Sequence, residues 1–206
     1  MTDTIADTLI ELASSHEGDF RSAIQAAVRA LWSGEWAIND FLDQMTDAID
    51  RYYEFAWQEG AAEVDVSPEE RTDQEQIALY RQMSEALPHV NAFALAIIDK
   101  SKENGGALGP LMGRAELWVK RYNEVRNLAM RMARSDAKLE WVIGPTEQHC
   151  PDCSKYNGRV YRASVWGDIR PQHRGLACHG YQCQCEFMPN PGYPATPGRP
   201  PRMTGA

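Results

Sequence analysis

The five cysteines of this 206-residue chain all lie between residues 150 and 185, and three of its five histidines lie beside or among them. A Cys-Pro-Asp-Cys segment begins at Cys150, and its two-residue spacing allows both thiolates to bind one tetrahedral ion. The remaining cysteines lack that spacing. Clustered thiolates predict a closed, structural Zn2+ site with no open position for catalytic water. The expected ligands are Cys150, Cys153, Cys183 and Cys185, with Cys178 and His173 as alternates.

Two other forms of the cluster stay open from the residues alone. Two disulfides with one cysteine left over would need an oxidising compartment, and the acidic N-terminus shows no secretory signal that would favour one. A redox-active CxxC would need the strand-to-helix turn that lowers a thiol pKa. We expect a hairpin near Cys150 instead of such a turn, which argues against redox chemistry. A structural metal would stabilise a module too short to bury its own core.

Outside the cysteines, the sequence shows no pattern typical of catalysis. It contains no GxxxxGK[ST] loop, no GxGxxG, no GxSxG and no HExxH. His149 adjoins Cys150, but neighbouring side chains in a strand point to opposite faces. Acidic residues at helical spacing form a stripe that we expect to face solvent: Asp40, Asp43, Asp47, Asp50 and Glu54. The sequence therefore predicts neither an enzyme nor a small-molecule substrate.

Residues 1–137 have the apolar periodicity of a helical body. Ser67, Pro68 and Glu70 have the types and spacing of a capping box, and they predict the start of a helix. We expect this helix to bury Ile77, Tyr80, Met83 and Leu87, and we expect Pro88 to kink or end it. A further seam at steps of four and three residues predicts a partner helix: Leu111, Ala115, Trp118, Tyr122, Val125, Ala129 and Met132.

Charge is distributed unevenly along the chain. Residues 1–75 carry 18 acidic side chains against four arginines, whereas residues 76–206 carry 11 acidic against 17 basic ones. An acidic first part argues against a nucleic-acid surface over the whole protein. The longest apolar run, from Ala92 to Ile98, is far shorter than the roughly 18 residues of a membrane span, so we expect no membrane partner.

The character of the sequence changes near Leu139. Residues 139–143 are typical of a strand, and Asn157-Gly158 predicts a hairpin turn between residues 155–156 and 159–161. Six prolines among the last 18 residues predict a disordered tail. The predicted fold class is α+β: a helical body (1–137), a small β-hairpin, cysteine-rich, zinc-ribbon-like module (138–188) and a disordered Pro-rich tail (189–206).

Several short segments of the module resemble the C-terminal signature of phage head morphogenesis proteins, the minor head proteins of tailed phages that are similar to protein F of phage Mu. They are Trp141-Val142-Ile143-Gly144-Pro145, His149-Cys150-Pro151-Asp152-Cys153, Asn157-Gly158-Arg159-Val160-Tyr161, Pro171-Gln172-His173 and Cys183-Gln184-Cys185. The resemblance extends over residues 36–187 and is most specific from Trp141 to Cys185. It departs from the family between His173 and Cys183, where residues 174–182 introduce Cys178 and His179.

The resemblance implies a low-copy virion protein, with no reaction of its own, that joins the head near the portal vertex. Its metal ligands would be Cys150, Cys153, Cys183 and Cys185, with His173 at the family's histidine position. Its expected partners are the portal protein, the major capsid protein or both, with packaged DNA as a further candidate. Its expected location is the virion head, and the host cytoplasm during procapsid assembly and genome packaging or delivery.

Two other classes of function compete with this assembly role. One is a nuclease or toxin-like enzyme module, for which the chain offers little room beyond the helical body and the cysteine module. The other is a zinc-dependent DNA-binding protein, which would need a basic helix next to the metal. The sequence predicts a hairpin and a loop between the two cysteine groups, which argues against a recognition helix there.

Overall fold

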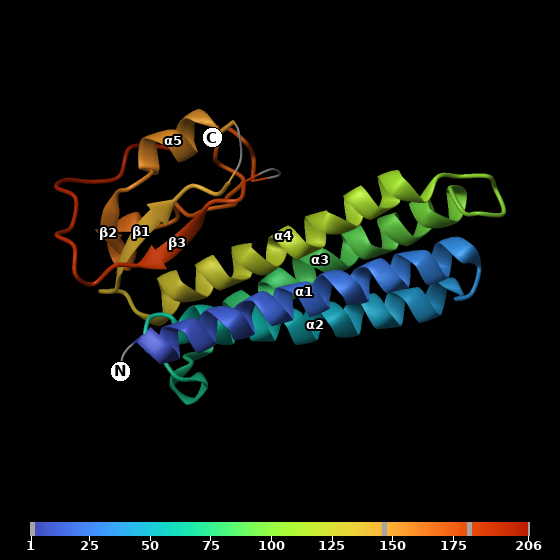
Figure 1. The fold of residues 1–206 in the computed structure, drawn as a ribbon, viewed down its shortest axis with the longest axis horizontal. Helices are drawn as coiled ribbons and strands as arrows, with labels where there is room; N and C mark the ends of the chain where they lie inside the picture. The colour runs from blue at the N-terminus through green and yellow to red at the C-terminus, as the bar shows by residue number, and fades with distance from the viewer. Residues whose placement is uncertain (1–2, 146–147, 181–182, 206) are drawn as a thin grey trace. The chain divides into compact units, whose positions relative to one another are not determined.

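The computed structural model describes residues 3–145, 148–180 and 183–205, with side chains described from His16 onward. It confirms the α+β class: four long helices are followed by short elements and a small antiparallel sheet (Figure 1). The elements are α1 (Asp3–Ser33), α2 (Ile38–Ala62), the 3-10 helix η1 (Pro68–Glu70), α3 (Asp73–Asp99), α4 (Leu108–Ala133), β1 (Lys138–Val142), α5 (Pro151–Tyr156), β2 (Val160–Arg162), α6 (Ala163–Trp166) and β3 (Glu186–Pro189).

The chain packs as two compact units. Unit 1 comprises residues 1–56 and 77–122, and unit 2 comprises residues 57–76 and 123–206. Unit 2 therefore contains the predicted cysteine module together with the last turns of α2 and α4. The three predicted segments, 1–137, 138–188 and 189–206, describe changes in sequence character, and the packing units are divided at other positions. Among the described residues, no helix combines the length and the apolar character that a membrane crossing requires.

Unit 1 is a helical bundle whose core is built from aromatic and aliphatic side chains. Phe20 of α1 lies beside Tyr53 of α2 and Tyr122 of α4, with ring centroids 6.1 and 6.3 Å apart. Phe93 of α3 stacks on Trp118 of α4 at 5.1 Å. The seam predicted on residues 111–132 is buried from Leu111 to Ala129, and Met132 is half-buried. The partner helices of that seam are therefore within the chain. The acidic stripe on α2 is exposed from Asp40 to Asp50, as predicted.

The prediction for the helix after Ser67 was wrong about where the helix begins and about which face it buries. The capping box at Ser67 exists, but it caps only η1. The long helix begins at Asp73, where Thr72 and Glu75 form a second reciprocal cap that the prediction missed. The helix runs through Pro88, which lies on its exposed side, where water can satisfy the carbonyl group that the proline leaves unpaired.

The second error concerns the face of α3 that is buried. Ile77, Tyr80 and Leu87 are exposed, whereas Met83 is buried. The core face instead consists of Leu79, Met83, Ala86, Val90, Phe93, Ala94 and Ile97. Apolar residues follow two faces of this helix, so periodicity alone did not identify the one that the bundle covers.

The sheet of unit 2 has the strand order β2-β1-β3, with both pairs antiparallel. Leu139 pairs with Tyr161 on one side and with Pro189 on the other. Side chains of β1 alternate between buried and half-buried, so Leu139 and Trp141 point into the core. Trp141 lies against Tyr156, Trp166 and Phe187, with ring centroids 4.9, 5.7 and 5.7 Å apart. This aromatic cluster is the centre of unit 2.

The predicted hairpin at Asn157-Gly158 was wrong. Residues 151–156 form the helix α5, and Gly158, with φ of 73°, follows its end in the left-handed conformation that glycine adopts easily. Cys150 is the N-cap and Pro151 occupies the first turn, which together favour a helix start. The glycine therefore ends a helix, and the chain then enters β2.

The Pro-rich tail begins at Pro189, the last residue of β3, and has no further helix or strand among its described residues. It is not disordered, because it lies against the rest of unit 2. The Tyr156 hydroxyl donates a hydrogen bond to the carbonyl oxygen of Pro201 at 2.8 Å. The Thr196 hydroxyl accepts one from the backbone N–H of Val160 at 3.0 Å. Composition could not predict these contacts because the partner groups belong to residues far away in the sequence.

Candidate metal centre

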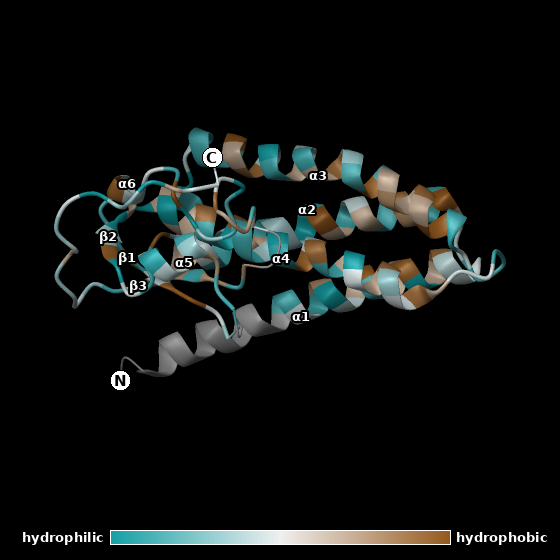
Figure 2. Ribbon diagram, turned by 90° about the horizontal axis from the view of Figure 1, so that it is seen from above, coloured by the Kyte–Doolittle hydropathy of each residue, from teal (hydrophilic) through white to brown (hydrophobic). Residues whose placement is uncertain are grey.

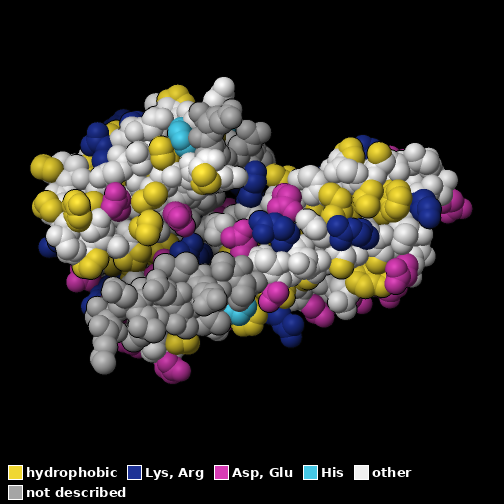
Figure 3. All heavy atoms as spheres, viewed as in Figure 1, with side chains coloured by type: hydrophobic (Ala, Val, Ile, Leu, Met, Phe, Trp, Pro, Cys, Tyr) yellow, Lys and Arg dark blue, Asp and Glu magenta, His cyan; other side chains and the backbone are white. Residues whose placement is uncertain are grey.

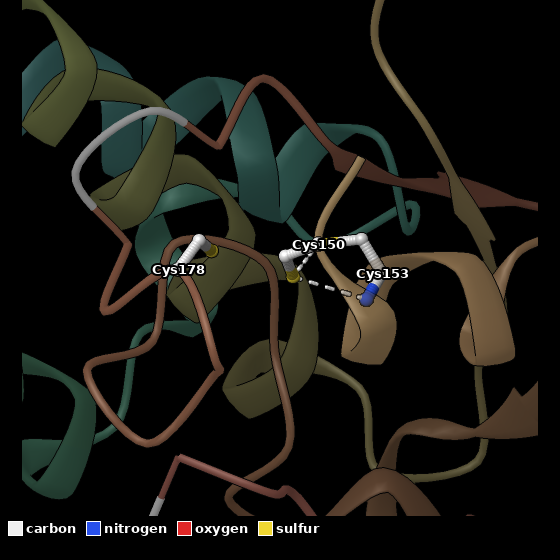
Figure 4. Close-up of side chains that lie close together, drawn as sticks. All are labelled: Cys150, Cys153 and Cys178. Carbon is white, nitrogen blue, oxygen red and sulfur yellow. Dashed lines mark hydrogen bonds between the residues drawn. The ribbon is translucent and has the colours of Figure 1, made fainter. Parts of the chain in front are cut away.

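The five cysteine sulfurs gather in unit 2 as two overlapping groups. One group contains Cys150, Cys153 and Cys178, and the other contains Cys153, Cys183 and Cys185, with all sulfurs of a group within 4.8 Å of one another. Cys153 belongs to both groups. Figure 4 shows the first group, with Cys178 on a loop near Cys150 and Cys153 at the start of α5. All five residues are free thiols in the structure.

Within each group, the spacing of the three sulfurs fits one metal ion. Metal–sulfur bonds of about 2.3 Å in a tetrahedron place neighbouring sulfurs about 3.8 Å apart. The sulfur of Cys153 lies 3.6 Å from that of Cys183 and 3.2 Å from that of Cys150. Cys153, Cys183 and Cys185 are buried, whereas Cys150 and Cys178 are partly exposed. The buried group therefore offers three ligands, and the two partly exposed cysteines are the candidates for a fourth.

Local backbone structure positions Cys150 and Cys153. Cys150 precedes the first turn of α5, and its sulfur accepts a hydrogen bond from the Cys153 backbone N–H at 3.3 Å. The helical turn brings residues three apart onto the same side, so both sulfurs face one point. The two cysteines of the Cys-Pro-Asp-Cys segment are thus brought together by a short helix and not by the hairpin that we predicted.

A close backbone approach positions Cys183 and Cys185. Gly144, just after β1, lies so near the intervening Gln184 that an added Cβ would be 2.2 Å from the Gln184 carbonyl oxygen. Only glycine leaves room for that approach. The strand pairing of Val142 with Glu186 continues the same contact, so β1 and β3 hold this Cys-Gln-Cys segment in place.

Hydrogen bonds among the thiols and their burial shift the pKa values of the cysteines in opposite directions. Hydrogen bonds from the thiols of Cys153 and Cys183 lower the pKa of Cys185 to about 4. Hydrogen bonds to Cys183 and Cys185, together with burial, raise the pKa of Cys153. Burial also raises the pKa of Cys178, to about 11. Neighbouring thiolates repel one another, and a divalent cation would remove that repulsion. The arrangement can therefore hold a metal ion.

Asp152, inside the Cys-Pro-Asp-Cys segment, connects α5 to two distant segments. Its fully buried carboxylate accepts hydrogen bonds from the Ala177 backbone N–H at 2.8 Å and from the Thr204 hydroxyl at 2.9 Å, and it forms an ion pair with Lys155. Burial by itself would raise the pKa of Asp152, but the hydrogen bonds from Lys155, Thr204 and Ala177 outweigh burial and lower it. Asp152 thus fixes the loop that carries Cys178.

Two buried amides support the segment that carries Cys185. The Asn127 side chain of α4 donates to Oε1 of Gln172 at 2.9 Å and accepts from the Phe187 backbone N–H at 2.7 Å. Gln172, which has a positive φ, donates in turn to the Cys185 carbonyl oxygen. Sequence analysis missed Asp152, Asn127 and Gln172 as supporting residues. Only Asp152 had a signal, its position between two cysteines; the amides are isolated polar residues in the sequence.

The predicted alternate His173 belongs to neither group of sulfurs. Its Nδ1 accepts a hydrogen bond from the Gly175 backbone N–H at 3.0 Å. Burial and the nearby Arg170 lower its pKa, which favours the neutral ring. The other predicted alternate, Cys178, is in the first group. Residues 181 and 182, which precede Cys183, lie outside the described residues.

The helix α5 removes two of the sequence-based arguments against other functions. Redox chemistry and DNA binding were both disfavoured because no helix was expected at Cys150. In the structure a helix is present, but the pKa of Cys153 is raised, and the basic side chain of α5, Lys155, is paired with Asp152. On the face drawn in Figure 3, acidic and basic side chains are interspersed over the helices. These observations do not favour either alternative.

Comparison with known proteins gives no relative for this chain. No protein-family model, no curated protein and no solved structure matches it.

Proposed function

We propose that unit 2 is held together by one structural Zn2+ ion, bound by Cys153, Cys183 and Cys185 of the buried group and by Cys150. The single observation that carries this proposal is the convergence of the three buried sulfurs from α5 and from the segment before β3, with the sulfur of Cys150 3.2 Å from that of Cys153. Four thiolates give a closed tetrahedral site, which supports folding and leaves no position for a reacting water. The ion would hold two segments 30 residues apart in sequence.

Metal content and thiol titration test this proposal together. The purified chain should contain about one zinc ion per molecule, and all five thiols should react once the ion is removed under denaturing conditions. Cys150→Ser and Cys178→Ser form a matched pair, because both residues are partly exposed and belong to the same group. Only Cys150→Ser should lower the zinc content. A chain with no metal and a single reactive thiol would mean disulfides instead.

The wider role that we propose is structural: a minor head protein of a tailed phage or prophage, active in procapsid assembly or in genome packaging or delivery at the portal vertex. Its support is the signature in residues 141–185, whose cysteine pairs include sulfurs that converge in the structure. The partners would be the portal protein, the major capsid protein or both, and packaged DNA would be a further one. The location would be the virion head, and the host cytoplasm during assembly.

Particle composition tests the wider role. The chain should be co-produced with the capsid and portal proteins of the genome that encodes it, and the particles should be separated by sedimentation. The chain should sediment with procapsids in low copy number, and Cys153→Ser should reduce its incorporation. A chain that stays at the top of the gradient, with normal particles formed in its absence, would contradict an assembly role.

A further inference from the structure

The exposed side of α3 carries an apolar stripe in unit 1. Ile77, Tyr80 and Leu95 are 66%, 60% and 62% exposed. Leu87 and Ile98 are exposed as well, and Ser84 and Asn91 fill the remaining positions. These seven residues, which we call the α3 stripe, follow one another at steps of three and four, the spacing of a coiled-coil seam. Brown segments along α3 in Figure 2 mark its hydrophobic residues.

The α3 stripe is separate from the face of α3 that packs in the core. The bundle already covers a different side of α3, through Leu79, Met83, Val90, Phe93 and Ile97. A helix in a monomeric bundle needs one apolar face, whereas α3 has two. Contiguous apolar surface of this kind marks an interaction site.

The order of apolar and polar residues in the α3 stripe is nearly the same when it is followed from either end. With the midpoint between Leu87 and Pro88, Ile77 corresponds to Ile98, Tyr80 to Leu95 and Ser84 to Asn91. A twofold interface requires such a self-complementary surface, because each residue meets its counterpart on the second copy. Two α3 helices in antiparallel orientation would therefore pair apolar with apolar and polar with polar residues within the stripe, and Leu87, at its centre, would lie opposite Pro88 of the second copy.

Charges at the two ends of the α3 stripe favour the same orientation. Asp73, the first residue of α3, and Lys102, just beyond its end, are both exposed and equally far from the midpoint. Antiparallel pairing brings Asp73 near Lys102 of the second copy at both ends, whereas parallel pairing would bring like charges together. We propose that the α3 stripe is a homodimer interface, and that its occupant is the α3 stripe of a second copy in antiparallel orientation.

The mass in solution tests the dimer. Sedimentation equilibrium of the full chain over a concentration series should show twice the 23.2 kDa chain mass. Leu95→Glu places a charge in the apolar seam and should raise the dimer dissociation constant about 100-fold or more. Tyr193→Glu is the matched control, because Tyr193 is similarly exposed, at 65%, but lies in the tail. A monomer at every concentration, or a dimer that resists Leu95→Glu, overturns the proposal.

A charge pair tests the register. In the proposed dimer Tyr80 faces Leu95 of the second copy, while the two positions are too far apart to meet within one helix. Tyr80→Lys and Leu95→Glu should each weaken the dimer, and the double variant should recover most of its affinity. A double variant that is weaker than both single variants overturns the antiparallel register. Zinc content should remain the same in all variants, so this test is independent of the metal site.

Discussion

The two units bury their side chains in different ways. The core of unit 1 consists of apolar residues that long helices present at regular spacing, such as Phe20, Ile49 and Phe93. Unit 2 has short elements, a compact aromatic cluster and the sulfurs. All four buried polar or charged residues of the described chain belong to it: Glu75, Asn127, Asp152 and Gln172.

Because their cores differ in this way, we expect the two units to respond differently to substitution. Apolar burial is roughly proportional to area and is spread over many residues, so a bundle loses stability in proportion to what is removed. A buried polar network is directional, and each group must have its partner. Unit 2 should therefore depend on a few residues, and unit 1 should depend on many.

The largest expected effect follows from removing the sulfur that both groups share. Cys153→Ser, or a strong chelator on the wild-type chain, should abolish zinc binding and unfold the sheet region, because the free energy of metal binding contributes directly to folding. Hydrogen exchange should report fast exchange in β1 and β3 while the amides of α1 and of the second half of α3, which belong to unit 1, stay protected. Uniform loss of protection in both units would contradict separate stabilisation.

The next effect concerns the backbone contact at Gly144. Gly144→Ala would place a Cβ 2.2 Å from the Gln184 carbonyl oxygen and should displace Cys183 and Cys185, with a large loss of zinc affinity in a chelator competition. Gly113→Ala is the control, since nothing lies within 4 Å of an added Cβ there. In the interior of α4 this alanine should stabilise the helix by up to about 1 kcal/mol. Equal zinc affinity in both variants would show that the close approach is not needed.

In unit 1 the largest single effect should come from Phe93, which stacks on Trp118 and meets the edge of Phe41. Phe93→Ala should lower the free energy of unfolding by about 3–5 kcal/mol, because it leaves a cavity. Leu117→Ala, at a partly exposed position of α4, should change it by about 0.5 kcal/mol or less. Denaturant unfolding followed by circular dichroism measures both, and zinc content should stay the same. Loss of zinc in Phe93→Ala would mean that the two units are coupled.

The two units also differ in how far the sequence predicted them. Helical periodicity predicted the helical body over residues 1–137 and the buried seam on α4, because burial on one helical face leaves a repeated pattern. It placed Ile77 and Tyr80 in the core because α3 has two apolar faces and the sequence does not state which one another helix covers. The capping box at Ser67 is a strong local signal, and it predicted the start of the long helix too early. It caps a short 3-10 helix, and the long helix begins at Asp73.

For unit 2 the sequence predicted the participants better than their geometry. Clustering identified all five cysteines, and four of them were assigned as ligands. The prediction of a hairpin at Asn157-Gly158 was wrong because the same residue pair also suits the end of a helix. Cys150, as the N-cap, and Pro151, in the first turn, favour a helix before it. The support from Asn127 and Gln172 could not be predicted, because their partners are each other and backbone groups that only the fold brings together.

The smallest of these effects tests whether the buried polar groups of unit 2 act together. Asp152→Asn keeps the size of the side chain but removes the charge that Lys155 and Thr204 bind. It should lower the stability of unit 2 by about 1–3 kcal/mol. It should also free the tail, so that trypsin cleaves faster after Arg202, which Met203 follows.

Asp136→Asn, whose side chain is 76% exposed, is the matched control and should change neither stability nor cleavage. Zinc should still bind to Asp152→Asn, because the carboxylate is a support and not a ligand. If the tail remained protected, its contacts with Tyr156 and Val160 would be sufficient to hold it. If zinc were lost, the loop that carries Cys178 would be needed for metal binding in addition to the buried group of Cys153, Cys183 and Cys185. The two readouts thus separate a residue that fixes the tail from one that shapes the site, and they show how closely the polar groups of unit 2 depend on one another.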